Sequence, residues 1–165
     1  VRQQGLEGIV AKKRDSRYYP GKTTGEWVKI KNLLDDDFIV CGYIAKSPNI
    51  ASLVLGQYKI GRKAGNNDSR IIQLSRELAY KGRVAIGQSN TDFKIITAYP
   101  RATAYPFAQK PPADNKDAVW LVPELVCKVK FISRTAGGAL RQPVFVGLRP
   151  DKSAAEALEY QWKRV

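Results

Sequence analysis

Residues 38–44 read FIVCGYI and residues 53–60 read LVLGQYKI, and these two apolar runs decide the fold class. Runs of this length, rich in branched and aromatic residues and bounded by polar turns, are typical of buried β-strands. Three further stretches have the same character: 78–86 (LAYKGRVAI), 120–132 (WLVPELVCKVKFI) and 144–148 (VFVGL). The sequence therefore predicts an all-β dominated fold built on five strands of uneven length.

One helix is predicted between the third and fourth strands, over residues 90–99, with Asn90 or Thr91 as its N-cap and Pro100 beyond its end. Five strands with interior glycines and a helix at this position match the five-stranded Greek-key barrel called the OB-fold. An SH3-like barrel or a small sandwich fits the strand count almost as well. Ser153 and Glu156 form a capping box, which predicts a short C-terminal helix over residues 153–162.

Ahead of the barrel lie two short extended segments, 8–12 (GIVAK) and 26–30 (EWVKI), separated by a polar turn. Two strands cannot bury a core alone, so residues 1–34 read as the end of a domain that lies elsewhere. The acidic residues 35–37 (DDD) suit a hinge or linker. The predicted organisation is a remnant over 1–34, a barrel over 35–152 and a helical tail over 153–165.

Composition excludes several classes of site. The 28 Lys and Arg against 15 Asp and Glu give a net charge of +13, which favours a polyanion such as nucleic acid over a membrane surface. Without His, Ser-His-Asp and Cys-His catalysis are excluded. Cys41 and Cys127 are expected to be buried thiols in a reducing compartment. The chain has no Met and begins with Val1, so we expect a piece of a longer polypeptide.

Glu7 and the alternating Lys29 and Lys31 form a candidate anion site. Alternate residues of a strand share a face, so the two lysines should project together. They repel each other unless an anion lies between them. Phosphates bridged by a divalent metal, with Glu7 as one oxygen ligand, are a natural candidate. The alternative is a solvated, salt-bridged pair of strands.

These motifs resemble those of ATP-dependent DNA ligases of the bacterial ligase D type. EGIVAK (7–12) and WVKIK (27–31) are similar to the fourth and fifth nucleotidyltransferase motifs, and Arg149-Pro150-Asp151-Lys152 is similar to the sixth, R-x-D-K. The connecting segments AKKRDSRYYPG, YKGRVAIG, VPELVCKVKF and LRQPVFVGLRPDK are similar as well. The resemblance implies an enzyme that uses ATP and Mg²⁺ to seal breaks in duplex DNA through enzyme-adenylate and DNA-adenylate intermediates. Residues 1–34 would then be the C-terminal remnant of its α+β adenylation (nucleotidyltransferase) domain.

The resemblance also implies residue roles. Glu7 would bind the metal, and Lys29 and Lys31 would contact the nucleotide phosphates. Arg149, Asp151 and Lys152 would orient the leaving pyrophosphate when the barrel rotates about the hinge at 35–37 and closes. We expect a basic face to contact DNA through the following side chains: Lys12, Arg14, Lys81, Arg83, Lys128, Lys130 and Arg141.

One departure bears on activity. The family's K-x-D-G motif, which carries the nucleophilic lysine, is absent, and Lys22-Thr23-Thr24-Gly25 lacks its Asp. We therefore expect this chain alone neither to adenylate itself nor to seal nicks. The resemblance further implies a monomeric piece of a cytoplasmic, nucleoid-associated bacterial enzyme that acts without a membrane and with the end-binding protein Ku.

Two other functions stay open. The first is a stand-alone OB-fold module that holds single-stranded nucleic acid by aromatic stacking in a basic groove. The second is a capping-type RNA guanylyltransferase, because those enzymes share R-x-D-K; the ligase-like connecting segments disfavour it.

Overall fold

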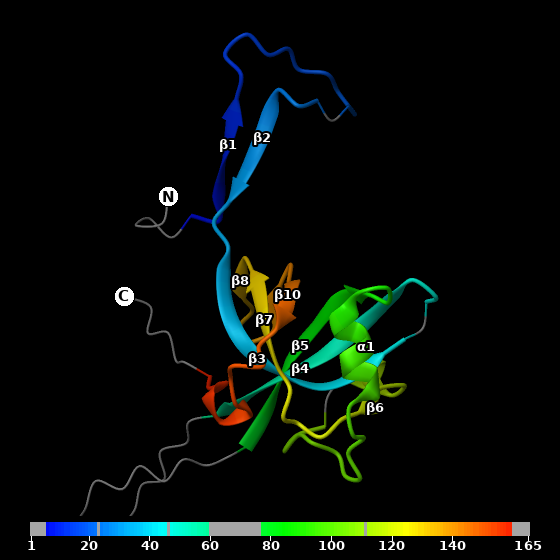
Figure 1. Cartoon of the computed structure of the whole chain (residues 1–165). Helices are drawn as coiled ribbons and strands as arrows, with labels where there is room; N and C mark the ends of the chain where they lie inside the picture. The colour runs from blue at the N-terminus through cyan, green and yellow to red at the C-terminus, as the bar shows by residue number, and fades with distance from the viewer. Residues whose placement is uncertain (1–5, 23, 46, 60–76, 111, 160–165) are drawn as a thin grey trace, which may run out of the picture.

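The computed structural model describes residues 6–22, 24–45, 47–59, 77–110 and 112–159, and it is built mainly of antiparallel strands (Figure 1). The strands are β1 (Gly8–Lys12), β2 (Trp27–Lys31), β3 (Leu34–Ile44), β4 (Ile50–Lys59), β5 (Glu77–Gly87), β6 (Val119–Trp120), β7 (Val126–Phe131), β8 (Ser133–Arg134), β9 (Leu140–Arg141) and β10 (Val144–Leu148). One α-helix, α1 (Thr91–Ala98), and two 3-10 turns, η1 (Ala113–Asn115) and η2 (Ala154–Glu156), complete the elements.

The five long strands of the barrel follow the order β10-β7-β3-β4-β5, with β6 added beside β3. The central strand β3 pairs with β7 along its first half and with β4 along its second half. Register shifts at Val40/Gly42, Leu55/Gly56 and Phe145/Gly147 bend the strands, and the outer strands β5 and β10 approach each other. The predicted β-dominated fold with one helix after the third barrel strand is confirmed, and the arrangement is consistent with an OB-fold.

Helix α1 covers the barrel interior with Phe93 and Ile96, which pack into a buried cluster formed mainly by β3, β4, β5 and β7. The Asn90 side chain caps the helix by accepting a hydrogen bond from the Asp92 amide at 2.8 Å. The Asp92 carboxylate in turn accepts from the Leu148 amide at 3.0 Å, beside the irregular pairing of β10. The helix is thereby fixed to the last strand by a polar bond as well as by its apolar face.

A second buried cluster lies on the other face of the sheet and contains Ile39, Cys41, Val54 and Leu78. Phe107, from the segment between α1 and η1, and Ala157, from the C-terminal segment, cover it. The thiols of Cys41 and Cys127 are free and buried, as expected, and burial raises the pKa of both.

The C-terminal segment differs from its prediction. The Ser153–Glu156 capping box is present, but it starts a single 3-10 turn, η2, in place of an α-helix. After this turn the chain is extended: Leu158 forms a parallel bridge with Tyr58, and the Glu159 amide donates to the Tyr58 carbonyl at 2.8 Å. Pairing with the end of β4 thus competes with helix formation. Residues 160–162 of the predicted helix lie outside the described part of the chain.

Residues 35–37 do not form the predicted linker, because all three lie within β3 and pair with β7. Each carboxylate there meets a cation. Asp35 pairs with Lys128 at 3.0 Å, Asp36 with Arg134 at 2.6 Å and Asp37 with Arg149 at 3.3 Å. This compensation allows a run of three acids to remain in a strand. The break between the N-terminal segment and the barrel is instead at residues 32–33, between β2 and β3.

The N-terminal segment is a two-stranded antiparallel hairpin, β1–β2, that projects from the barrel (Figure 1). Its second strand begins one residue later than predicted. Every residue of β2 is exposed, and so are Ile9 and Val10 of β1. The described residues include no helix of the length and hydropathy that a membrane crossing requires.

A partly buried polar cluster of Asp36, Gln57 and Arg134 yields a first prediction. Asp36 accepts from Arg134 and from Gln57, whose own Oε1 accepts from Arg134 at 3.2 Å. Asp36→Ala leaves both partners short of a hydrogen bond and should lower the free energy of unfolding by about 2–4 kcal/mol in urea denaturation. The neighbouring Asp35→Ala is the control. Its ion pair is more exposed, so the loss should stay below about 1 kcal/mol; equal losses would contradict the cluster's role.

Close packing at Gly42 yields a second prediction. An added Cβ there would lie 2.6 Å from the Val119 carbonyl oxygen and 3.1 Å from the Trp120 ring. Gly42→Ala must therefore push β6 away from β3, and it should cost about 1–3 kcal/mol in the same assay. Gly87→Ala serves as the matched control, because the nearest atom to its new Cβ is 3.9 Å away. Comparable unfolding midpoints for the two variants would refute the packing argument.

Candidate functional site

Glu7, Lys29 and Lys31 line one cavity of about 390 Å³ where the hairpin meets the barrel. The β1–β2 register places Gly8 opposite Lys31 and Val10 opposite Lys29, so the two lysines share a strand face as predicted. The barrel contributes Ile132 and Gln142 to the same cavity. The structure thus places all three predicted residues in the lining of one cavity.

These side chains are engaged with the barrel. The Glu7 carboxylate pairs with Arg141 at 2.7 Å, and the Lys31 ammonium donates to the Gln142 side-chain oxygen at 2.9 Å. Gln142 has a φ of 50°, and it is the one non-glycine residue with a positive φ in the described part of the chain. The end of β9 and the turn that follows it therefore contact two of the three predicted site residues, and the spacing of the motifs does not indicate this contact.

The R-x-D-K segment forms a separate charged turn at the end of β10. The Arg149 guanidinium donates to both carboxylate oxygens of Asp151, at 2.8 and 2.7 Å, and this bidentate pair lowers the pKa of Asp151 to about 2. Lys152 pairs with Glu156 at 3.2 Å. Among the described residues, no hydrogen bond or ion pair joins this turn to Glu7, Lys29 or Lys31.

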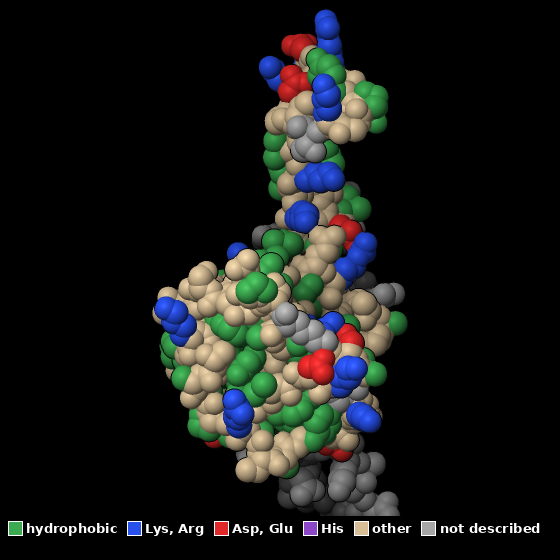
Figure 2. All heavy atoms as spheres, turned by 90° about the vertical axis from the view of Figure 1, so that its right-hand side faces the viewer, with side chains coloured by type: hydrophobic (Ala, Val, Ile, Leu, Met, Phe, Trp, Pro, Cys, Tyr) green, Lys and Arg blue, Asp and Glu red, His purple; other side chains and the backbone are tan. Residues whose placement is uncertain are grey.

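Most of the predicted DNA-binding cations already have internal partners. Lys12 lies over the Trp27 ring at 4.0 Å, Arg83 pairs with Asp114, Lys128 with Asp35 and Arg141 with Glu7. Arg14 and Lys130 are exposed. Figure 2 shows Lys and Arg side chains spaced along the projecting hairpin. The positive charge that remains open to a polyanion therefore lies partly on the hairpin.

Lys81 does not lie on an exposed face of the barrel, contrary to the expectation of an exposed basic face. Its residue is 3% exposed, and its ammonium is 2.5 Å from Glu159. Burial lowers the pKa of Lys81, and the adjacent carboxylate acts in the opposite direction. Gly138 of the β8–β9 turn and Glu159 of the C-terminal segment lie beside the Lys81 ammonium. The alternation of residues along the strand does not indicate that these two segments cover Lys81.

Sequence reasoning also missed Arg134 and Glu159. Arg134 lies next to the turn TAGG (135–138), whose paired glycines indicate a tight β8–β9 hairpin. Glu159 falls in the segment that capping chemistry assigned to a helix. The TAGG turn is visible in the sequence and could have indicated the position of Arg134. The position of Glu159 depends on a tertiary pairing with β4, which the sequence does not indicate.

The site offers one carboxylate, Glu7, to a divalent cation and two lysines, Lys29 and Lys31, to phosphate groups. No group of three or more Cys, Asp or Glu side chains suited to a metal occurs in the described residues. Mg²⁺ commonly takes one or two carboxylates and completes its shell with phosphate oxygens and water, so Glu7 alone is compatible with that ion only beside a bound phosphate. Lys29 and Lys31 are the groups that would hold such a phosphate.

Comparison with known proteins identifies the family of the chain. The family model described as "ATP dependent DNA ligase C terminal region" matches residues 46–152. The chain is 32% identical over 159 residues to the "Multifunctional non-homologous end joining protein LigD" of Pseudomonas aeruginosa, covering 92% of this chain and 17% of that protein. The corresponding protein of Mycobacterium tuberculosis is 33% identical over 165 residues, covering 95% and 20%. The chain thus spans about a fifth of the length of these curated relatives.

Solved structures agree in fold and coverage. The ligase domain of Mycobacterium tuberculosis LigD superposes with a TM-score of 0.59 at 30% identity, covering 96% of this chain and 49% of that one. A mycobacterial DNA ligase D complexed with ATP gives 0.57 at 32%, covering 96% and 48%. From the barrel, its motifs and these matches together, the chain belongs to the family of ATP-dependent DNA ligase C-terminal regions.

Proposed function

We propose that this chain is the C-terminal part of an enzyme that joins breaks in duplex DNA, consisting of the end of its adenylation domain and its OB barrel. The observation that carries the proposal is the cavity shared by Glu7, Lys29, Lys31 and the barrel turn at Gln142. A carboxylate and two lysines at the junction of two structural units suit a nucleotide whose phosphates change position during the reaction. The roles of ATP, Mg²⁺ and the adenylated intermediates are proposed only because the chain belongs to this family.

Within this proposal the chain's own groups have distinct tasks. Lys29 and Lys31 bind phosphate oxygens and balance the charge that develops on them. Glu7 is the carboxylate available to a divalent cation, whose chemistry is to neutralise and orient the phosphates. Arg149, Asp151 and Lys152 would reach the nucleotide after a rotation of the barrel. We place the pivot at residues 32–33, which lie between strands.

The exposed apolar residues of the hairpin support its assignment to a larger domain. Trp27, Val28 and Ile30 of β2 are 37%, 53% and 52% exposed. A hairpin with so little buried surface is marginal by itself. We propose that further strands of the adenylation domain cover it in the parent enzyme. Ku remains a proposed partner, since the relatives' name associates them with end joining.

The alternative of a single-strand-binding module has less support. Base stacking needs accessible aromatic faces. Here Tyr43 packs edge-on against Phe93 and Tyr80 against Phe107, and Trp120 contacts Tyr105 and Phe107 at right angles. These rings contribute to the two buried clusters.

Adenylation tests the proposal directly. Incubating the chain with labelled ATP and Mg²⁺ should produce no acid-labile protein adduct, because the nucleophilic lysine belongs to the missing K-x-D-G motif. The parent enzyme should become labelled, and Lys29→Met in the parent should reduce the rate of labelling by about 10²-fold or more, the range found for a single transition-state contact. A labelled adduct on the isolated chain, or an unchanged rate for the variant, would contradict the proposal.

DNA binding gives a separate prediction. Lys128→Glu/Lys130→Glu in the parent enzyme should weaken binding to a nicked duplex and reduce the slope of log K against log salt by about 2, one unit for each lost phosphate contact. Lys94→Glu on the exposed side of α1 is the control and should leave the slope within about 0.5 of its original value. If both proteins show the same slope, β7 is not part of the DNA-binding face.

A further inference from the structure

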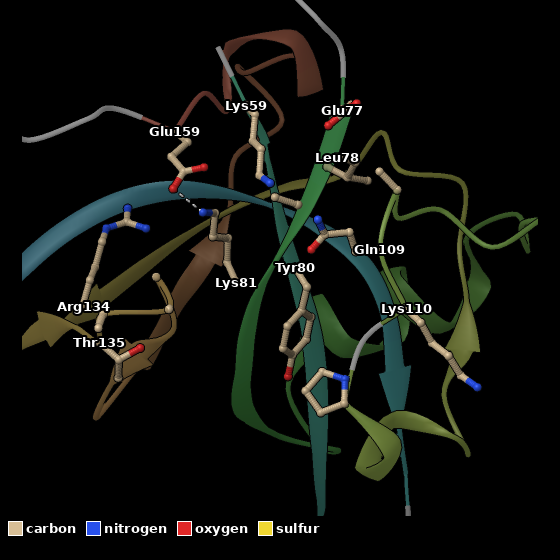
Figure 3. A pocket seen from close by; sticks show the side chains of 16 residues that line it. Lys59, Glu77, Leu78, Tyr80, Lys81, Gln109, Lys110, Arg134, Thr135 and Glu159 are labelled. Atoms are coloured by element: carbon tan, nitrogen blue, oxygen red, sulfur yellow. Dashed lines mark ion pairs between the residues drawn. The ribbon is translucent and has the colours of Figure 1, made fainter. Parts of the chain in front are cut away.

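A cavity of about 490 Å³ lies apart from the Glu7 site, between β5, the β8–β9 turn and residues 108–110 and 112 (Figure 3). Its lining includes four cations, Lys59, Lys81, Lys110 and Arg134, and two carboxylates, Glu77 and Glu159. Arg134 is committed to Asp36 and Gln57, and Lys59 lies opposite Glu77 in the β4–β5 register. Lys110 is exposed, so Lys81 is the buried cation of this lining whose described partner is Glu159.

Lys81 carries a buried ammonium with few partners. The residue is 3% exposed, and Glu159 is the one partner described for its ammonium, at 2.5 Å. An ammonium has three N–H donors, and a buried charge is stable only when paired and hydrogen-bonded. Lys81 also lines the cavity, which has room for an anion.

The Glu159 side chain can leave Lys81 without unfolding the segment that carries it. Its backbone is held independently, because Glu159 donates to the Tyr58 carbonyl at 2.8 Å and the Ala157 carbonyl accepts from Tyr58 at 3.0 Å. The Glu159 side chain is 30% exposed, whereas that of Lys81 is 4% exposed. Rotation of the carboxylate into water would therefore open the ammonium to another anion at little cost in structure.

The β8–β9 turn brings backbone donors to the same place. Thr135 organises the turn by accepting from the Gly138 amide with its carbonyl and from the Ala139 amide with its hydroxyl. Gly138 has a φ of 81°, and an added Cβ would lie 3.4 Å from the Lys81 Nζ. No hydrogen bond is described for the amides of Ala136 and Gly137 at the exposed tip. Successive free amides beside a cation are a common setting for phosphate.

We propose that this cavity is a phosphate subsite for the DNA backbone, with Lys81 as its central cation and the Glu159 carboxylate as an internal competitor for it. The proposal rests on the proposed function for the identity of the ligand, but the phosphate chemistry is independent of it. No covalent step is involved. The C-terminal segment then regulates access to a DNA contact by the position of one side chain.

The test follows amide chemical shifts of the 165-residue chain during titration with inorganic phosphate at constant ionic strength. Glu159→Gln should tighten phosphate binding at least about 10-fold, since 1.4 kcal/mol of lost competition is tenfold in affinity. The affected amides should include Lys81, Gly137 and Gly138. Asp15→Asn, which removes one negative charge from the hairpin, is the matched control and should change binding less than about 2-fold.

The double variant Lys81→Met/Glu159→Gln guards against a folding artefact, because it leaves neither charge unpaired. It should stay folded, with dispersed spectra, and lose the phosphate response at these amides. A phosphate response that persists in the double variant, or a Glu159→Gln chain that is destabilised without tighter binding, would overturn the proposal and assign the pair to structure alone.

A nicked duplex separates the two sources of phosphate. Glu159→Gln should also tighten duplex binding by the parent enzyme about 3-fold or more. Tighter binding of inorganic phosphate with unchanged duplex binding would overturn the DNA assignment while leaving the DNA ligase function intact. Failure of the proposed function itself would appear differently, as absence of adenylation in the parent enzyme.

Discussion

Strand β3 is the element on which the rest of the barrel depends. Its first half pairs with β7 and its second half pairs with β4. Any change in the register of β3 therefore displaces both neighbouring strands. Its apolar side chains alternate between the two buried clusters: Phe38 and Val40 belong to one cluster, and Ile39 and Cys41 to the other. A slip of one residue would move each set of side chains to the opposite face of the sheet, where the packing partners do not match its shapes.

Carboxylates on β3 also organise the positive charge of the barrel. Asp35, Asp36 and Asp37 each hold one cation, and these cations come from β7, β8 and the turn after β10. The chain has a large excess of positive charge, yet much of it on the barrel is paired within the fold. The net charge alone therefore overestimates the surface available to a polyanion, and the exposed hairpin makes up part of the remainder.

Much of the fold followed from the sequence, because the strands are long apolar runs and the helix has a clear cap at Asn90. The pairing of Lys29 and Lys31 on one face followed from alternation. What failed has a common cause. Residues 35–37 looked like a linker because strand propensity disfavours Asp, and only tertiary ion pairs reverse that preference. Residues 153–162 looked helical because the capping box is local, whereas the competing bond to Tyr58 is not. Lys81 looked exposed because charged residues usually are.

The hairpin has a consequence for the behaviour of the chain in solution. Each of its two strands has one side whose backbone N–H and C=O groups find no neighbouring strand among the described residues, and branched apolar side chains stand beside them. Such an edge is a template on which another molecule can add a strand of its own. Concentrated solutions of the chain should consequently self-associate through β1 and β2.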